Sequence, residues 1–316
     1  MPKINIIVVN WNAGTQLVDM ARSIACFHDD LVESLIVVDN ASVDDSLASI
    51  EAIRAELPFG LQIIRNKENV GFGAACNQGA KSATAEFLLF LNPDTRLFDR
   101  SLTEPVEFLQ KQENARVGVV GIQLVDEGGG IARSCSRFPG VGVFFAQAVG
   151  LNRLSRFSAL SLHMAEWAHD KTRVVDHVIG AFYLMRRDLF QKLGGFDERF
   201  FVYLEDLDLS LRVNQAGYHN MYLSEAQAFH AGGGTSRQVK VHRLFYSLRS
   251  RLLYGFKHFD PLRAWALVVV TMGVEPLTRT VFSFLGSGWS GVLNTWKAYG
   301  MLFGDFGAIV RKAKDK

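Results

Sequence analysis

The 316-residue sequence predicts an α/β fold with a mostly parallel sheet covered by helices. In its first half, five apolar runs rich in β-branched residues alternate with segments of helical periodicity. Continuous apolar runs are typical of strands buried on both faces, as in a parallel sheet. Polar residues follow several of these runs, so they collect at one edge of the predicted sheet. The predicted strands are Ile4–Val9, Leu35–Val38, Leu61–Ile64, Phe87–Leu91 and Val117–Ile122.

The segments between and after the strands carry signals of helices. Ser42 with Asp45, and Ser101 with Glu104, have the spacing of capping boxes that open helices. Residues 128–172 show no regular periodicity, and they predict a long surface excursion that serves as a lid or an acceptor loop. The predicted helices are 46–56, 106–112, 187–193 and 205–216.

The composition changes near residue 236, which predicts a catalytic domain over residues 1–236 and a helical C-terminal segment over 237–316. Between Arg237 and His258 there are six Lys and Arg residues and no Asp or Glu. The uncharged window 264–274 is shorter than the roughly 20 residues that a membrane-spanning helix needs, so no transmembrane segment is predicted. The segment fits either contact with a membrane surface or an oligomer interface.

The overall composition excludes several classes of protein. A net charge of +2 argues against a nucleic-acid-binding protein. Cys26, Cys76 and Cys135 are widely spaced and odd in number, so neither a zinc site nor a disulfide framework is expected. The apolar run at the N-terminus predicts a first strand and not a signal peptide. We therefore expect a cytoplasmic protein, with peripheral contact to the inner face of the cell membrane as an open alternative.

Three polar residues follow the first two predicted strands. Asn10 ends the first, and Asp39 and Asn40 end the second. A carboxylate at this position can accept a hydrogen bond from the ring N–H of a uracil or thymine. The alternative is that Asp39 and Asn40 only cap the following loop.

A glycine-rich turn runs into a predicted helix at Asn69–Ala80. Gly71 and Gly73 allow the backbone to approach a ligand closely, and a helix N-terminus favours anions. The third glycine of a dinucleotide fingerprint is replaced by Cys76, so a nicotinamide cofactor is not indicated.

The fourth predicted strand ends in Asn92, Pro93 and Asp94. These residues are ordinary turn formers, which is one interpretation. The other is that the strand delivers Asp94 to a divalent cation, Mg²⁺ or Mn²⁺, that binds two phosphates.

Two further constellations lie in the second half. Glu205 and Asp206 begin a predicted helix, where they either complement its dipole or deprotonate a hydroxyl group. His230 ends an apolar strand ahead of three glycines, and it is either a structural residue or a ligand.

Six motifs in order resemble the family 2 inverting glycosyltransferases, and most of all the bacterial rhamnosyltransferases and their galactofuranosyltransferase relatives. The resemblance covers about residues 3–259. The motifs are VVNWN, VVDNASVDDS, ENVGFGAACNQG, LLFLNPDT, GAFYLMRRDLFQKLGGFDERFFVYLEDLDLSLRVNQAGY and AFHAGGGTS.

The resemblance implies a GT-A fold, with a Rossmann-like sheet, and a nucleotide-sugar donor. It makes Asp206 the catalytic base beside Glu205, and Asp94 and His230 the metal ligands. Asn92 stands where the family's DxD motif has its first aspartate. The residues implied to bind the nucleotide are Asn10, Asn12, Asp39, Asn40, Gly71, Gly73, Asn77 and Asn92.

The resemblance further implies transfer of L-rhamnose from dTDP-rhamnose to a cell-surface polysaccharide or a lipid-linked saccharide. Three alternatives remain open: a UDP- or GDP-sugar donor, a non-catalytic nucleotide-sugar-binding scaffold, and a nucleotidyltransferase. The last is disfavoured because the N-terminal loop VNWNAGTQ has no Lys or Arg for a triphosphate. A homo-oligomer is compatible with the C-terminal segment.

Overall fold

The computed structural model describes residues 3–164, 166–232 and 240–314, which form two compact units. The sheet unit comprises the described parts of residues 1–136, 167–198 and 205–235. The helical unit comprises the described parts of residues 137–166, 199–204 and 236–316. The expected boundary between residues 236 and 237 lies outside the described residues. Two earlier segments of the chain also belong to the helical unit.

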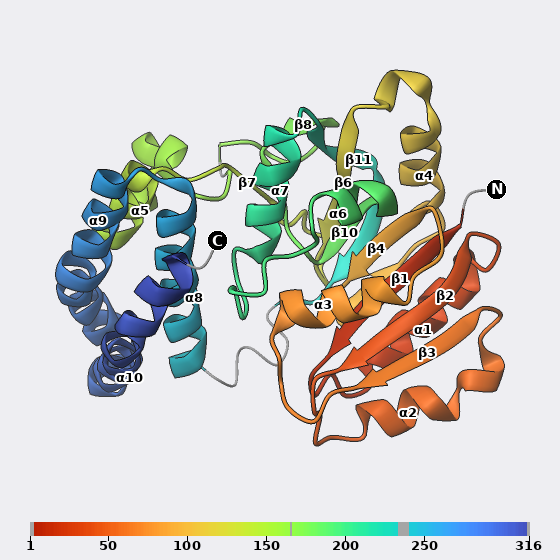
Figure 1. The fold of residues 1–316 in the computed structure, drawn as a ribbon, viewed down its shortest axis with the longest axis horizontal. Helices are drawn as coiled ribbons and strands as arrows, with labels where there is room; N and C mark the ends of the chain where they lie inside the picture. The colour runs from red at the N-terminus through yellow and green to blue at the C-terminus, as the bar shows by residue number, and fades with distance from the viewer. Residues whose placement is uncertain (1–2, 165, 233–239, 315–316) are drawn as a thin grey trace. The chain divides into compact units, whose positions relative to one another are not determined.

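The five strands expected from the sequence are all present in the sheet unit (Figure 1). The first four lie side by side and parallel, in the order β3-β2-β1-β4. Every residue of β1, β4 and β6 is buried, which explains their continuous apolar sequences. These strands are β1 (Ile4–Asn10), β2 (Val32–Asp39), β3 (Gly60–Arg65), β4 (Phe87–Leu91) and β6 (Val117–Val125).

The later strands make the sheet mixed. β10 (Phe182–Arg186) lies between β4 and β6 and is antiparallel to both. β11 (His219–His230) runs parallel to β6 and antiparallel to β5 (Thr95–Leu97) and β8 (Arg173–Val175). The order across the sheet is β3-β2-β1-β4-β10-β6-β11-β5. A separate ribbon pairs β7 (Cys135–Ser136) with β9 (His177–Val178).

The helices of the sheet unit follow the expected order. α3 approaches the sheet closely, because a Cβ on Gly79 would lie 2.6 Å from Cγ2 of Ile7. The α-helices are α1 (Gln16–Phe27), α2 (Ser46–Ala52), α3 (Phe72–Lys81), α4 (Thr103–Gln110), α6 (Arg187–Lys192) and α7 (Glu205–Gln215). Single 3₁₀ turns follow α2 and α4, at η1 (Arg54–Glu56) and η2 (Gln112–Asn114).

The two predicted capping boxes are wrong. Neither α2 nor α4 has a side-chain cap, and their N-cap residues are Asp45 and Leu102. The Ser42 hydroxyl instead accepts the backbone N–H of Asn12, and the Ser101 hydroxyl accepts that of Phe98. Both serines therefore tie loops together, a role that uses the same hydrogen-bonding capacity.

The helical unit contains the surface excursion and the C-terminal segment. Asp260 caps α9 by accepting a hydrogen bond from the N–H of Arg263. A π-helical turn then connects α9 directly to α10. The α-helices are α5 (Val141–Ala148), α8 (Lys240–His258), α9 (Pro261–Val269) and α10 (Glu275–Lys314). The other helical turns are η3 (Leu151–Arg153), η4 (Ser155–Leu160) and the π-turn η6 (Val270–Val274).

α10 is a helical hairpin that reverses at Gly288. That glycine has φ 60° and ψ −152°, a conformation that only glycine adopts readily. The Ser283 hydroxyl lies 2.9 Å from the Thr295 hydroxyl, although a straight helix would separate residues twelve apart by about 18 Å. The two arms therefore fold back on each other.

The uncharged window at 264–274 is part of a much longer helical region. Residues Pro261–Ala313 have the length and apolar composition of a helix that could cross a membrane. Inside the protein, 33% of the most apolar window of this region is buried. The helical region continues beyond the uncharged window, because α10 begins at Glu275, and it reverses at Gly288.

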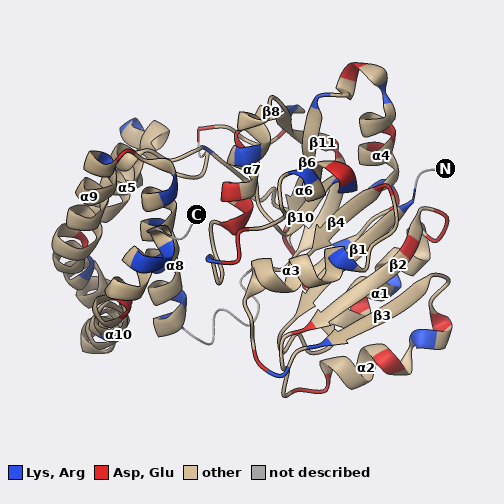
Figure 2. Cartoon of the chain, in the orientation of Figure 1, with Lys and Arg blue, Asp and Glu red and all other residues tan. Residues whose placement is uncertain are grey.

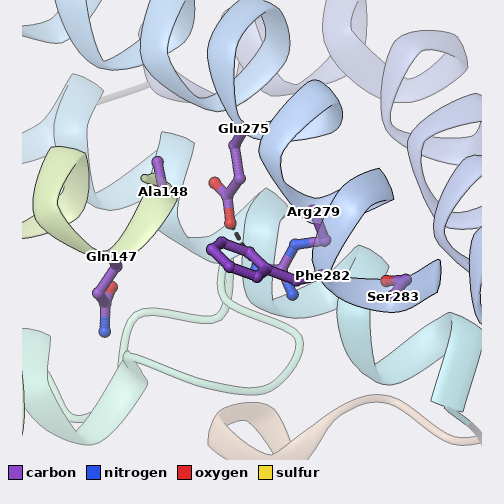
Figure 3. Close-up of a pocket in the computed structure, with 6 residues that line it drawn as sticks. All are labelled: Gln147, Ala148, Glu275, Arg279, Phe282 and Ser283. Atoms are coloured by element: carbon purple, nitrogen blue, oxygen red, sulfur yellow. Dashed lines mark hydrogen bonds and ion pairs between the residues drawn. The ribbon is translucent and has the colours of Figure 1, made fainter. Parts of the chain in front are cut away.

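Two arginines of α8 form ion pairs in which most of the charged groups are buried. Arg249 pairs with Asp305 at 2.8 Å, and Arg251 pairs with Glu275. Glu275 also binds Arg279 at 2.5 Å, beside a cavity of about 150 Å³ that Gln147 and Phe282 help to line (Figure 3). Two of the five Lys and Arg residues of α8 are therefore paired with acidic residues of α10.

Candidate active site

Asp39 is fixed at the ends of β1 and β2, where the register places it beside Asn10. The amide of Asn10 donates to Asp39 Oδ1 at 2.8 Å and to the Ser46 hydroxyl at 2.9 Å. The backbone N–H of Ser42 donates to Asp39 Oδ2 at 3.2 Å. Both residues are buried, so the carboxylate has a defined orientation at this edge of the sheet.

Asn12 shapes the loop beside this carboxylate. It has φ 54°, and its side-chain oxygen accepts the N–H of Val43 at 2.8 Å. Its own N–H donates to Ser42, which also accepts from Asn10 at 3.1 Å. The two loops that follow β1 and β2 are therefore cross-linked.

Asn40 joins this edge to the glycine-rich turn. Its amide nitrogen donates to the Gly71 carbonyl and to Asn69, both at 3.2 Å, and its oxygen accepts from Asn66 at 2.9 Å. Gly71 itself has φ 91° and ψ 167°, which L-amino acids with side chains rarely adopt. The turn thus depends on glycine at this position.

The start of α3 packs against the start of α7. A Cβ on Gly73 would lie 3.2 Å from the Cβ of Phe196 and 3.6 Å from that of Glu205, so this glycine permits close contact. Asn77 was expected to contact the nucleotide, but in the structure it binds other residues of the protein. Its oxygen accepts the Phe196 N–H, and its nitrogen donates to the Phe196 carbonyl and to Glu198, all at 2.9 Å.

Asn92, Asp94 and His230 converge where β4 and β11 end. His230 Nε2 lies 3.3 Å from Asp94 Oδ1 and 3.5 Å from the amide nitrogen of Asn92. The Ala231 N–H donates to the Asp94 carbonyl at 3.1 Å, which fixes the two turns together. The three side chains come from positions 138 residues apart at most, and the sheet brings them together.

This cluster can contribute to a metal site but does not complete one. Within residues 3–164, 166–232 and 240–314, no three His, Cys, Asp or Glu side chains are grouped to hold a metal. Asp94 offers a carboxylate, which suits Mg²⁺ or Mn²⁺, and His230 offers an imidazole, which is a softer ligand. Such ions commonly bind one or two protein carboxylates and take substrate phosphates and water as their other ligands.

Asp206 is held as an anion at the start of α7. Its Oδ2 accepts the Gly180 N–H at 2.8 Å and lies 3.3 Å from Nε2 of the buried His177. Its Oδ1 accepts the Leu207 N–H at 2.8 Å. Burial alone would raise the pKa of this carboxyl, but His177 and the two N–H groups outweigh it and lower the pKa.

The neighbouring Glu205 has the opposite protonation behaviour. Burial, followed by the charge of Asp206, raises the pKa of Glu205 well above its ordinary value. Its Oε2 is buried, and no hydrogen-bond partner for it lies among the described residues. The adjacent pair therefore combines one carboxyl group whose pKa is lowered with one whose pKa is raised, and such a separation of pKa values is typical of catalytic pairs.

A short backbone link joins the Asp206 site to the Asp94 site. Gly180 donates its N–H to Asp206, while the carbonyl of the next residue, Ala181, accepts the Asn92 N–H at 3.1 Å. The same Ala181 carbonyl lies 3.4 Å from the Thr95 hydroxyl. The carboxylate pair and the Asn92–Asp94 turn thus border the same two residues.

Sequence inspection missed His177 and Gly180. His177 lies in a short strand within an apolar stretch, where a histidine has no distinguishing pattern. Gly180 is the first residue of the motif GAFYLMRR, but only the structure shows that a Cβ there would lie 3.3 Å from Asp206 Oδ2. The chain immediately before α7 is also unusual: Tyr203 and Leu204 have φ of 69° and 65°, a conformation that costs free energy and occurs often at functional sites.

Comparison with known proteins identifies the family. Residues 5–194, more than half of the chain, match the sequence model described as Glycosyl transferase family 2. The chain belongs to this family. It is a glycosyltransferase, as the motifs and their order predicted.

This family 2 glycosyltransferase has rhamnosyltransferases among its relatives. It is 25% identical over 278 residues to N-acetylglucosaminyl-diphospho-decaprenol L-rhamnosyltransferase of Mycobacterium tuberculosis, over 83% of this chain and 88% of the relative. It is also 25% identical over 244 residues to the O-antigen chain rhamnosyltransferase WbaN of Salmonella anatum, over 75% and 69% of the two chains.

The fold is that of the GT-A glycosyltransferases. The mannosyltransferase PcManGT from Pyrobaculum calidifontis, solved with GDP-Man and Mn²⁺, has a TM-score of 0.57 to this chain at 17% identity. The alignment covers 98% of this chain and 80% of PcManGT. The predicted fold class is confirmed, and at this identity the similarity concerns the fold alone.

Proposed function

We propose that this glycosyltransferase transfers L-rhamnose from dTDP-rhamnose to a hydroxyl group, with inversion at the anomeric carbon. The observation that carries the proposal is the Asp206 carboxyl group at the start of α7, whose oxygens accept the N–H groups of Gly180 and Leu207 and face His177. An inverting displacement requires a single general base, which deprotonates the acceptor hydroxyl. Asp206 borders the same backbone link as Asp94, where a diphosphate leaving group is expected.

Asp206 acts as the base in this mechanism. Its carboxylate takes the proton of the acceptor hydroxyl while the acceptor oxygen bonds to the anomeric carbon. The bond between that carbon and the phosphate oxygen breaks on the opposite face, and the nucleoside diphosphate leaves with the electron pair. The Gly180 N–H and His177 orient Oδ2, which leaves the acceptor to approach the remaining lone pairs.

The nucleotide lies along the edge formed by β1 and β2. Asp39 is proposed to accept the ring N–H of a pyrimidine base, and the Gly71 turn to approach the phosphates through its backbone. Asn10, Asn12 and Asn40 hold these elements in place through the hydrogen bonds described above. Asn77 is omitted, because Phe196 and Glu198 already use its amide.

A divalent cation is proposed to bind at Asp94 and His230. The fit rests on their separation of 3.3 Å, their position at the ends of β4 and β11, and the oxygen and nitrogen donors they offer. A cation bound there would supply charge that stabilises the leaving diphosphate. Asn92 would contribute its amide beside them.

The donor and acceptor are proposed from the relatives. Both relatives are named as rhamnosyltransferases, which supports a dTDP-rhamnose donor. One is named for a lipid-linked acceptor and the other for the O-antigen chain, which supports a saccharide acceptor of that kind. Such acceptors place the reaction in the bacterial cytoplasm or at the inner face of its membrane. UDP- and GDP-sugars remain the competing donors.

The first prediction concerns Asp206→Asn. Without a base, the rate of transfer should fall by about 10²- to 10⁴-fold, while dTDP still raises the melting temperature as it does in the wild type. The control is Asp99→Asn, which changes an exposed aspartate outside the site. Normal transfer by Asp206→Asn would contradict the mechanism.

A thermal-shift panel identifies the nucleotide. The wild-type protein is heated with dTDP, UDP, GDP or ADP, each with and without Mn²⁺. Stabilisation by dTDP or UDP that depends on Mn²⁺ supports the site as described. Stabilisation by GDP alone would overturn the rhamnose donor, and no shift with any nucleotide would contradict a nucleotide site in the free protein.

A further inference from the structure

The helical unit has an apolar tip at the reversal of the α10 hairpin. Here the hairpin tip means residues 280–296, the two half-arms on either side of Gly288. Six large apolar side chains of the tip are exposed to between 45% and 76%. They are Val281, Phe284, Leu285, Trp289, Leu293 and Trp296.

The stretch of chain that contains this tip carries little charge. From residue 264 to residue 296 the sequence contains only two charged residues, Glu275 and Arg279. They pair with each other at 2.5 Å, and Glu275 is buried. The exposed positions of this stretch are therefore apolar residues, glycines and serines, and Figure 2 shows α9 and α10 largely uncoloured by charge.

The nearest charges bracket the tip at equal distances. Arg279 lies nine residues before Gly288, and Lys297 lies nine residues after it. Nine residues of α-helix extend about 14 Å, which is about half of the roughly 30 Å hydrocarbon core of a bilayer. The uncharged part of the hairpin is thus long enough to enter one leaflet and too short to cross both.

The charges beyond the tip have one sign at the surface. Lys297, Arg311 and Lys312 are exposed on the second arm. The two acidic residues described within 261–314, Glu275 and Asp305, are not exposed and are paired with arginines. An apolar end followed by exposed cations complements the acyl chains and anionic headgroups of a membrane.

We propose that the hairpin tip inserts into one leaflet of an anionic phospholipid bilayer. Tryptophans at positions 289 and 296 then lie in the acyl chains and near the interface, respectively, and Lys297 lies at the level of the phosphates. A second copy of the chain fits less well, because a two-fold contact through this surface would bring the exposed cations of both copies together. The inference is independent of which sugar the enzyme transfers.

The test is co-sedimentation of the full chain with vesicles of phosphatidylcholine, with or without phosphatidylglycerol. The wild type should pellet with the anionic vesicles, and Leu285→Glu with Trp289→Glu should lower its partition coefficient about tenfold or more, since buried charge opposes insertion. Val174→Glu is the matched control, because Val174 is an exposed apolar residue of β8 in the sheet unit. Equal thermal stability and an equal dTDP shift establish that the double variant is folded.

Depth is measured by tryptophan fluorescence with acyl-brominated lipids. Quenching should occur in the wild type and fall strongly in Trp289→Phe, and alkaline carbonate should release the protein from the vesicles. Failure to pellet would overturn the proposal, as would a dimer that the double variant dissociates. Resistance to carbonate would also overturn it, because it would indicate a spanning helix. None of these outcomes bears on the catalytic proposal, which is tested by the nucleotide shifts and Asp206→Asn.

Discussion

At the scale of single residues, the two carboxyl groups at the start of α7 are adjacent in sequence yet differ in environment. Asp206 accepts two backbone N–H groups and faces His177, whereas Oε2 of Glu205 is buried with no described partner. The pKa of Asp206 is lowered and the pKa of Glu205 is raised for these reasons. The difference has consequences for both rate and stability.

His177 is expected to act as a positioning residue for Asp206. In His177→Phe the attraction that favours the anion is lost, so the pKa of Asp206 rises. Because the base must be ionised, the acidic limb of the pH profile of kcat/KM should move to higher pH. His28→Gln is the control, since His28 is buried too but contacts the Phe98 carbonyl at 2.8 Å instead. An acidic limb that does not move in His177→Phe would contradict this role.

Glu205→Gln should make the protein more stable at neutral pH. Above the ordinary pKa of Glu, near 4.3, the unfolded state releases this proton while the folded state retains it. The free energy of unfolding of the wild type then falls with rising pH by up to about 1.4 kcal/mol per pH unit. Gln mimics the neutral acid and lacks this loss, so its advantage should grow with pH.

The measurement is denaturant unfolding between about pH 5 and about pH 8. Glu113→Gln, at an exposed position, should show no such trend relative to the wild type. A constant difference between Glu205→Gln and the wild type across this range would show that Glu205 is ionised in the folded protein.

At the scale of elements, continuous apolar runs predicted the strands better than local capping signals predicted the helix starts. The continuous apolar run Phe87–Leu91 is β4 without any change of bounds. Ser42 and Ser101 had the spacing of caps, but Ser42 binds the loop after β1, and Ser101 binds Phe98 in its own turn and the Gln227 carbonyl in β11. Distant partners of this kind are not revealed by the sequence. The reversal at Gly288 was likewise invisible, since glycines are common throughout α10 and only one has a positive φ.

The contact between α3 and the sheet should be sensitive to a single methyl group. Gly79→Ala would place its Cβ 2.6 Å from Ile7 and 3.3 Å from Val38, so we expect a loss of about 1–3 kcal/mol in the free energy of unfolding. Gly304→Ala is the matched control in α10, where no atom lies within 4 Å of the added Cβ. It should be neutral or gain up to about 1 kcal/mol. Urea unfolding of both variants decides this, and equal midpoints would refute the close contact.

At the scale of the whole molecule, the sequence predicted the sheet edge but not the full route of the chain. Asp39, Asp94 and Asp206 were identified because each follows a strand or begins a helix after a turn. The placement of β10 between β4 and β6, antiparallel to both, could not be read from apolar runs, since strand order depends on contacts between distant segments. For the same reason, His177 and the segments of the helical unit at residues 137–166 and 199–204 escaped prediction.

The strand order also decides when each strand finds its neighbours during synthesis. Both neighbours of β6, which are β10 and β11, are translated after it, and all nine residues of β6 are buried in the finished sheet. Until both have been synthesised, β6 has two unpaired edges and an exposed apolar surface. Both features make an incomplete chain prone to aggregation. A chain that ends between residues 125 and 182 lacks both neighbours and would therefore depend on chaperones, although it already carries Asp39 and Asp94.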